Sequence, residues 1–277
     1  MKNPTLFLVP TPLGNLKDIT LRALEVLREV DLIVCEDTRH TRKLLTHYDI
    51  SKPLVSCERF NEAKRTKYIL EQLADGKQVA MVSDAGTPNV SDPGSRIISQ
   101  TRAWGIPIVA LPGPSALITA FSASGFTAPL RFLGFFPRKK EVMEREIQKM
   151  TITDEVTIFY ESPRRLVKTL RMIHERIPER EVCIAREMTK IHEEYIVGTV
   201  QQVLDKICPT SIKGEVTVLV RGSHEEETFK ASSLQDMARN LLMNGHSHKD
   251  ILMTLSQETG INRNELYRML LDVKKNL

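Results

Sequence analysis

The chain has 277 residues, 41% of them hydrophobic, which is enough for one or two domains with substantial cores. Its formal net charge of +4 is compatible with an anionic partner but does not by itself indicate one. No apolar run approaches the roughly 18 residues of a membrane span, and proline interrupts the N-terminal apolar run. We therefore expect a cytosolic protein with neither a membrane segment nor a signal peptide.

Short β-rich runs alternate with helical patterns over the first part of the chain. Strands are predicted at 5–10, 31–37, 53–57, 78–84 and 106–113. Between the first two, residues 21–30 place leucines at 21, 24 and 27, which is the spacing of one helical face. Strands that alternate with helices in this way predict an α/β layer with a mostly parallel sheet.

A second set of strands follows, at 131–136, 155–162, 181–187, 193–200 and 215–222. Helices are predicted among them at 143–150, 164–177 and 200–207. Only the five residues MTKIH separate the third and fourth strands of this set. A gap this short favours a hairpin, so the second sheet is predicted to be mixed.

The composition of the sequence changes after residue 222, where an acidic, serine-containing segment is typical of a linker. Three helical patterns follow at 234–245, 248–260 and 262–275, with Gly245 and Gly260 where C-terminal caps would lie. Their order is similar to a helix-turn-helix layout. The predicted fold class is therefore α/β with two α/β domains, at 1–117 and 118–224, and a small C-terminal helical domain at 230–277.

Glycine and proline gather after three of the predicted strands, at 9–18, 83–94 and 111–116. In open α/β sheets the carboxyl ends of parallel strands are where ligands bind. Ordinary strand-to-helix loops remain the alternative for any single turn, but three turns at one edge favour a small-molecule pocket. Neither a P-loop nor a G-x-G-x-x-G fingerprint is present, which argues against a nucleoside triphosphate and against the common dinucleotide fold.

Charged residues also follow strand ends. Glu36 and Asp37 lie just before Arg39 and Arg42, a pattern that combines a carboxylate able to accept a proton with cations able to hold phosphate. The alternative is that Asp37 only caps the following helix.

Three other charged stretches have the same two interpretations. Glu161 precedes Arg164, Lys190 lies in a run of charges at 185–195, and Arg138 and Lys139 follow an aromatic pair. These residues either contact nucleic acid or form salt bridges and solvated helix starts.

No metal site is predicted. His246 and His248 form an H-x-H pair, but no cysteine or acidic cluster of ligand spacing accompanies them, so solvated histidines are expected. The four cysteines, Cys35, Cys57, Cys183 and Cys208, form no C-x-x-C pair, and buried thiols are expected.

Six motifs together identify a family resemblance: PTPLGNLKDIT, CEDTRHT, SDAGTPNVSDPG, LPGPSA, FYESPRR and REMTK. They resemble the ribosomal RNA small-subunit methyltransferase I family, the 16S rRNA (cytidine-2′-O)-methyltransferases of the tetrapyrrole methylase-like superfamily. The resemblance runs from about residue 4 to residue 222. The helical tail is similar to a small C-terminal domain found in this family.

The resemblance implies S-adenosylmethionine as cofactor, bound in a cleft between the two α/β domains. The residues that it implies as cofactor contacts are Leu13, Gly14, Asp84, Ala85, Gly86, Thr87, Val90, Ser115, Ala116, Tyr160, Glu161 and Met188. Tetrapyrrole methylases carry G-x-G-P-G-D in the first loop, whereas this chain has PTPLGN with Asn15 at the position of the aspartate. This departure argues against tetrapyrrole methylation and is typical of the RNA-modifying branch.

The implied reaction is 2′-O-methylation of a decoding-centre (P-site) cytidine in the small ribosomal subunit, by a homodimer. Asp37 is the candidate general base, with Glu36 and Glu161 as alternatives. The candidate RNA-binding residues, some of which could instead brace these carboxylates, are Arg39, Arg42, Arg138, Lys139, Arg164 and Lys190. The C-terminal helices could grip RNA or support dimer packing. Two rival functions stay open: a same-fold methyltransferase for a small molecule or protein side chain, and an inactive RNA-binding protein.

Overall fold

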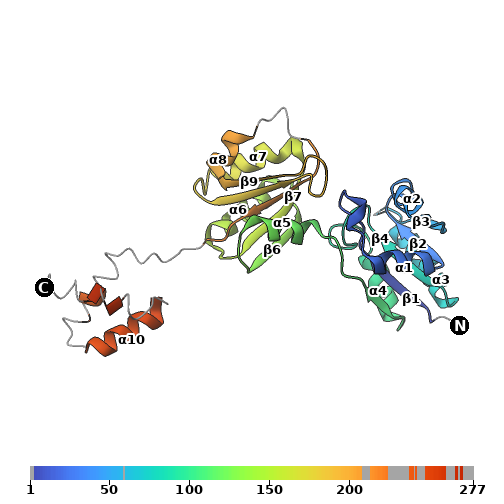
Figure 1. The fold of residues 1–277 in the computed structure, drawn as a ribbon, viewed down its shortest axis with the longest axis horizontal. Coiled ribbons are helices and arrows are strands. Elements are labelled where there is room, and N and C mark those ends of the chain that lie inside the picture. The colour runs from blue at the N-terminus through green and yellow to red at the C-terminus, as the bar shows by residue number, and fades with distance from the viewer. Residues whose placement is uncertain are drawn as a thin grey trace. The chain divides into compact units, whose positions relative to one another are not determined.

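The computed structural model describes residues 3–58, 60–207, 213–223, 237–239, 241, 247–259, 266–267 and 269–270. The chain forms two compact units, Met1–Gly222 and Ser223–Leu277. Both sheets lie in the first unit, and the second unit is small and helical (Figure 1). Among the described residues, no helix has the length and apolar character needed to cross a membrane.

The first sheet has five parallel strands in the order β3-β2-β4-β1-β5. Its strands are β1 (Thr5–Val9), β2 (Leu32–Cys35), β3 (Leu54–Ser56), β4 (Gln78–Val82) and β5 (Ile108–Ala110). Its helices are η1 (Leu16–Asp18, a 3-10 turn), α1 (Leu21–Glu29), α2 (Thr38–His47), α3 (Glu62–Ala74) and α4 (Ser95–Ala103). The predicted parallel sheet is confirmed, and the carboxyl ends of its strands meet at one edge.

Helices cover both faces of this sheet, because neighbouring residues of a strand point to opposite sides. In β2, Ile33 packs in a cluster with Leu27 of α1. The next residue, Val34, packs on the other face with Ile69 of α3 and Ile97 of α4. Burial on both faces explains why these strands are continuously apolar rather than alternating.

The second sheet has the order β6-β7-β10-β8-β9, with β6 and β7 parallel and the other pairs antiparallel. Its strands are β6 (Leu130–Phe135), β7 (Val156–Glu161), β8 (Glu181–Arg186), β9 (Glu194–Thr199) and β10 (Val216–Val220). Its helices are α5 (Ala116–Ser124), α6 (Lys140–Ile152), α7 (Pro163–His174) and α8 (Val200–Lys206). The predicted β8–β9 hairpin and the mixed sheet are both confirmed.

Two cores enclose the second sheet. One is built by α6, α7 and α8 around Phe159 and Leu170, and the other by α5 around Ile158. Figure 1 shows α7 and α8 on one side of the strands and α5 on the other. The chain therefore contains two α/β layers, as predicted.

The second unit contains α10 (His248–Thr259) and helical residues at 237–239, 241, 266–267 and 269–270. Ala238, Ile251, Leu255, Leu266 and Leu270 form its buried cluster. A small helical C-terminal part was predicted and is confirmed. Gly245, Gly260 and His246 lie outside the described residues, as does the turn between the last two predicted helices.

Three of the four cysteines are described, and Cys35, Cys57 and Cys183 are free and buried. Burial raises the pKa of the Cys57 and Cys183 thiols to about 11, so both stay protonated at neutral pH. The expected buried thiols are confirmed at these three positions. Cys208 lies outside the described residues.

Candidate active site

A pocket of about 320 Å³ lies where loops of the first sheet face strand ends of the second sheet. The expected cofactor contacts that line it are Leu13, Asp84, Ala85, Gly86, Thr87, Val90, Ser115, Ala116, Tyr160, Glu161 and Met188. Gly14 is not among the lining residues; the stem of Lys190 lies so close to it that a Cβ at Gly14 would overlap that side chain. Residues from both domains thus converge on one cavity, of a size typical for small-molecule sites.

The turn at 83–94 is fastened to the loop after β1 by backbone hydrogen bonds. Thr11 N donates to Gly86 O and Gly86 N donates to Thr11 O, each at 2.9 Å, and the Ser83 hydroxyl donates to the same Gly86 carbonyl at 2.9 Å. Gly86 has φ of +79°, where a Cβ would also lie 3.1 Å from Leu13 Cδ2. Glycine is therefore required at this point of the pocket wall.

The same turn is also tied to the loop after β5. Thr87 Oγ1 donates to Pro114 O at 2.9 Å, next to Ser115 and Ala116 at the start of α5. Ser115 makes no side-chain cap hydrogen bond, so its side chain does not occupy the first-turn N–H groups of α5. The glycine- and proline-rich stretches after β1, β4 and β5 therefore form one hydrogen-bonded wall.

Glu161 ends β7 and is only 3% exposed. Its Oε1 accepts from Ser162 N at 2.7 Å, and its Oε2 accepts from Thr169 Oγ1 at 2.7 Å and lies 3.2 Å from Arg165 Nη2. Arg165 in turn donates to Pro137 O at 2.7 Å. The Glu161 carboxylate thus joins the start of α7 to the loop after β6.

Asp37 lies at the N-terminus of α2, outside the residues that line the pocket. Its Oδ1 accepts from Arg39 N, and its Oδ2 lies 2.8 Å from Arg39 Nη2. These hydrogen bonds to Arg39 lower the pKa of Asp37 to about 2. Asp37 therefore caps α2, which is the second of the two predicted interpretations. A carboxylate with this pKa is also a weak base at neutral pH.

Other carboxylates do reach the pocket. Asp84 accepts from Asp37 N at 3.1 Å and lines the cavity. Asp92 lines the pocket and also a small neighbouring cavity that Glu36 lines. Asp92 lies close enough to Tyr160 to add to the burial that raises the pKa of this phenol to about 12. Tyr160 thus stays protonated.

Sequence reasoning did not single out several lining residues. Asp92 is the second aspartate of the stretch SDAGTPNVSDPG at 83–94, so its motif indicated it. Phe135 belongs to the aromatic pair that precedes Arg138. The other unpredicted lining residues are Ser91, Ser162, Pro163, Gly214, Glu215, Val216 and Thr217. The last four come from β10 and the residues before it, which carry no glycine- and proline-rich motif comparable to those after β1, β4 and β5.

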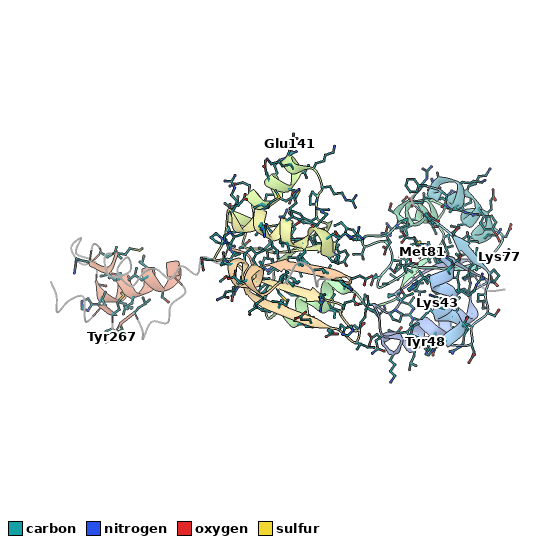
Figure 2. All side chains as sticks on the ribbon, turned by 90° about the horizontal axis from the view of Figure 1, so that it is seen from above. Lys43, Tyr48, Lys77, Met81, Glu141 and Tyr267 are labelled. Carbon is teal, nitrogen blue, oxygen red and sulfur yellow. The ribbon has the colours of Figure 1, made fainter. Side chains whose placement is uncertain are left out.

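The predicted cations fall into separate groups. Arg39 and Arg42, together with Lys43, line a shallow surface depression on α2. Figure 2 labels Lys43. Arg138 and Lys139 lie in the loop after β6, and both are exposed. That loop adjoins the start of α7 through the hydrogen bond from Arg165 to Pro137 O.

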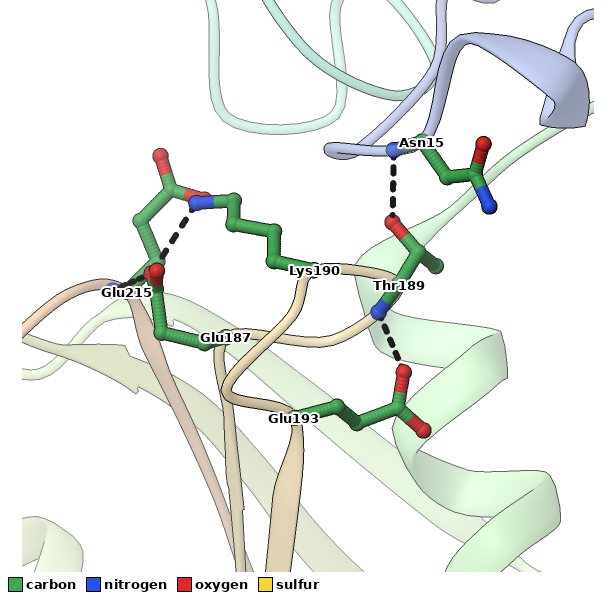
Figure 3. Close-up of polar contacts among 6 residues, drawn as sticks. All are labelled: Asn15, Glu187, Thr189, Lys190, Glu193 and Glu215. Atoms are coloured by element: carbon green, nitrogen blue, oxygen red, sulfur yellow. Dashed lines mark hydrogen bonds and ion pairs between the residues drawn. The ribbon is translucent and has the colours of Figure 1, made fainter.

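Lys190 has a different environment, in the turn between β8 and β9 (Figure 3). Its Nζ lies 2.9 Å from Glu187 Oε1 and 3.1 Å from Glu215 Oε2. Although partial burial opposes the shift, these two carboxylates raise the pKa of Lys190. Its charge is compensated within the protein, as the bracing alternative predicted.

The β8–β9 turn also reaches the first domain. Asn15 N donates to Thr189 Oγ1 at 3.1 Å, and Thr189 N donates to Glu193 (Figure 3). Glu187 and Thr189 both have positive φ, of 48° and 66°. The tight turn between them presents Met188, which is 8% exposed, to the pocket.

The pocket fits the chemistry of S-adenosylmethionine, which combines an aromatic base, an amino-acid end and a positively charged sulfur. Leu13, Val90 and Met188 supply apolar walls, and the carboxylates of Asp84 and Asp92 can oppose a positive charge. The start of α5 at Ala116 can accept an anionic group. Among the described residues, no group of three or more metal-ligating side chains forms.

Comparison with known proteins identifies the family of the chain. The family described as Tetrapyrrole (Corrin/Porphyrin) Methylases matches residues 5–204. "Ribosomal RNA small subunit methyltransferase I" of Thermotoga maritima is 48% identical over 78% of this chain and 98% of its own, and that of Bacillus subtilis is 38% identical over 95% and 92%.

Solved structures show the same fold. The methyltransferase CobJ matches with a TM-score of 0.61 at 21% identity, over 80% of this chain and 95% of its own. Diphthine synthase matches with the same TM-score at 17% identity, over 78% and 90%. The chain therefore belongs to the tetrapyrrole methylase family, and within it to the ribosomal RNA small subunit methyltransferase I family, whose members use S-adenosylmethionine as methyl donor.

Proposed function

We propose that this protein methylates the ribose 2′-oxygen of a decoding-centre (P-site) cytidine in 16S rRNA of the small ribosomal subunit. The observation that carries the proposal is the pocket between the two α/β domains, in a chain whose relatives are named for methylation of small-subunit rRNA. The choice of a cytidine 2′-oxygen rests on the family resemblance of the motifs. Because the substrate is ribosomal, the cytoplasm is the proposed location.

S-adenosylmethionine, when bound, supplies a methyl group activated by the positive charge on sulfur. The turn at 83–94, the start of α5 and Met188 would hold it. The lining residues from both domains would hold the cofactor beside the ribose, and such positioning supplies much of the acceleration in bimolecular reactions.

The remaining task of the protein is to place the ribose and to accept its proton. Partial removal of the 2′-proton assists attack, and a positioned carboxylate can provide it. We assign this role to Asp92, because it lines the pocket, whereas Asp37 lies outside it with a pKa of about 2. Asp37 and Asp84 instead position the start of α2, through the hydrogen bond from Asp37 N to Asp84.

Exposed cations around the site provide contacts to RNA phosphates. Arg39 and Arg42 on α2, Arg138 and Lys139 after β6, and Arg164 at the start of α7 are the proposed contacts. Lys190 is not included, because two carboxylates, Glu187 and Glu215, pair with it and its side chain is only 30% exposed. Arg39 is kept, because it pairs with one carboxylate and its side chain is 88% exposed.

The test is transfer of tritium from labelled S-adenosylmethionine to small ribosomal subunits that lack the modification, with the product mapped by nuclease digestion and mass spectrometry. Label on the 2′-oxygen of one cytidine is expected. Label on a base, on ribosomal protein or on no ribosomal component would overturn the proposal, and the last result together with cofactor binding would direct the search to small-molecule acceptors.

Homodimer formation is proposed from the family resemblance alone. Light scattering across a concentration series measures it directly, and a mass near 31.5 kDa at all concentrations would contradict it.

A further inference from the structure

Phe135, at the end of β6, is a large apolar side chain that lines the pocket while remaining 63% exposed. The other large apolar side chains nearby are more deeply placed: Phe136 is 1% exposed and Met188 is 8% exposed. Burial of an aromatic ring stabilises a protein, so a ring left half in solvent at a pocket mouth points to a binding contact.

An irregularity in the β6–β7 pairing puts the ring there. Phe132 pairs with Ile158, but Phe135 pairs with Tyr160, so β6 has one more residue than β7 over this stretch. Gly134, in the extra stretch, has φ of +68°, as expected for a glycine in a β-bulge.

The bulge decides which face each aromatic residue occupies. With regular alternation, Phe135 would lie on the same face as Leu133, which packs against the core formed by α6, α7 and α8. The extra residue returns Phe135 to the face of Phe132 and sends Phe136 into that core instead. The fold thus uses a local irregularity to present Phe135 to the pocket.

The ring is also held in place. Phe135 and Phe132 both make edge-to-face contacts with Tyr160, with centroids 5.6 Å and 5.0 Å apart. Just beyond it, Arg165 donates to Phe136 O and Pro137 O, which fixes the chain that follows. One face of a ring held by its neighbours can accept a flat partner with little loss of conformational entropy.

The surroundings of Phe135 favour a nucleotide over an apolar partner. Arg138 and Lys139 follow it by three and four residues, both exposed. Arg164 is exposed next to Ser162 and Pro163, which line the same pocket. An aromatic ring flanked by cations is the usual arrangement for stacking an unpaired base while the cations contact the phosphates.

We propose that Phe135 stacks against a nucleobase of the RNA substrate, and so positions the target nucleotide at the pocket mouth. This inference rests on the proposed function. A nucleotide whose ribose must reach the methyl donor has to leave its own stack, and a stacking platform offsets part of that unfavourable step.

The test compares Phe135→Ala, Phe135→Leu, Phe135→Tyr and Phe135→Trp. Each variant is assayed for kcat and KM with small ribosomal subunits and, by calorimetry, for affinity to S-adenosylmethionine. Stacking predicts that kcat/KM falls about 10- to 100-fold for alanine and leucine, with Tyr and Trp within about threefold of the parent chain. Cofactor affinity is expected to stay unchanged throughout.

Trp104→Leu is the matched control, because Trp104 is 57% exposed and does not line the pocket. Full activity of Phe135→Leu would overturn the inference, because bulk alone would then suffice. A parallel loss of cofactor affinity would overturn it too, since the ring would then contact the cofactor. If the parent chain itself labels no RNA, the proposed function fails and this inference fails with it.

Discussion

At the scale of single residues, Asp37 and Asp92 illustrate how the surroundings of an aspartate determine its role. Asp37 accepts three hydrogen bonds from Arg39, which lower its pKa to about 2, and it caps α2. Asp92 lines the pocket, and its charge contributes to the raised pKa of Tyr160. Asparagine caps a helix as well as aspartate does, so Asp37→Asn retains the cap while removing the charge.

We therefore expect Asp92→Asn to lower kcat about 100-fold or more, the usual range for loss of a general base. Asp37→Asn is expected to lower kcat less than about tenfold. Single-turnover methylation of small ribosomal subunits measures both. A loss of about 100-fold in Asp37→Asn with a fully active Asp92→Asn would reverse the assignment.

Glu161 presents a second residue-level case, in which burial and partners indicate stability. The Thr169 hydroxyl and the Arg165 guanidinium both contact Oε2 of Glu161. Replacement of Glu161 by alanine removes this shared acceptor. We expect Glu161→Ala to lower the free energy of unfolding by about 2–3 kcal/mol, the range for a lost charged hydrogen-bond partner at a buried site.

Urea denaturation measures this change. Glu141, an exposed carboxylate on α6, gives the control, and Glu141→Ala is expected to stay within about 0.5 kcal/mol (Figure 2). Equal stability of the two variants would show that the Glu161 network is not a structural brace.

At the scale of elements, the β8–β9 turn was predicted as a hairpin, but the role of its lysine depended on distant partners. Lys190 pairs with Glu215, 25 residues away, and its stem covers Gly14 of the first domain. Local sequence could not distinguish this bracing from phosphate binding.

The two roles differ in salt dependence. Each phosphate contact adds roughly 0.7 to 0.9 to the slope of log affinity against log salt concentration. Lys190→Met keeps an unbranched stem against Gly14 and is expected to leave the slope for small subunits unchanged. Arg164→Met, at an exposed position, is expected to reduce it by about 1. A reduced slope in Lys190→Met would restore Lys190 as a phosphate contact.

The elements also show where sequence patterns succeed and where they fail. Apolar runs and the five-residue gap were sufficient to predict the strands of both sheets and the hairpin, because the length of an apolar run and the length of a loop can be read directly from local sequence. The position of Phe135 was not predictable, because a one-residue bulge reverses the face that simple alternation assigns. Asp37 had two interpretations in the sequence, and only the Arg39 geometry distinguishes them.

At the scale of the whole molecule, the relatives indicate which of the two units carries the catalytic activity. The Thermotoga maritima relative is matched over 98% of its length by 218 residues, close to the size of the Met1–Gly222 unit. It carries the same name as the Bacillus subtilis relative, which matches 95% of this chain. The chemistry is therefore expected to reside in the first unit.

The composition of the second unit refines this expectation. Residues 223–277 contain seven lysines and arginines against eight aspartates and glutamates. A segment with one net negative charge adds no overall electrostatic attraction for phosphate. We infer that this unit contributes to shape recognition or to subunit packing rather than to charge-driven RNA binding.

A chain that ends at residue 225 tests both statements, since it keeps β10 and every residue that lines the pocket. We expect it to bind S-adenosylmethionine with unchanged affinity and to retain kcat within about fivefold, while the salt dependence of its binding to small subunits stays that of the full chain. Loss of cofactor binding would show that the second unit is needed for the pocket. A salt slope reduced by 1 or more would show that it contacts phosphates despite its composition, and a halved mass in light scattering would assign it to the dimer interface.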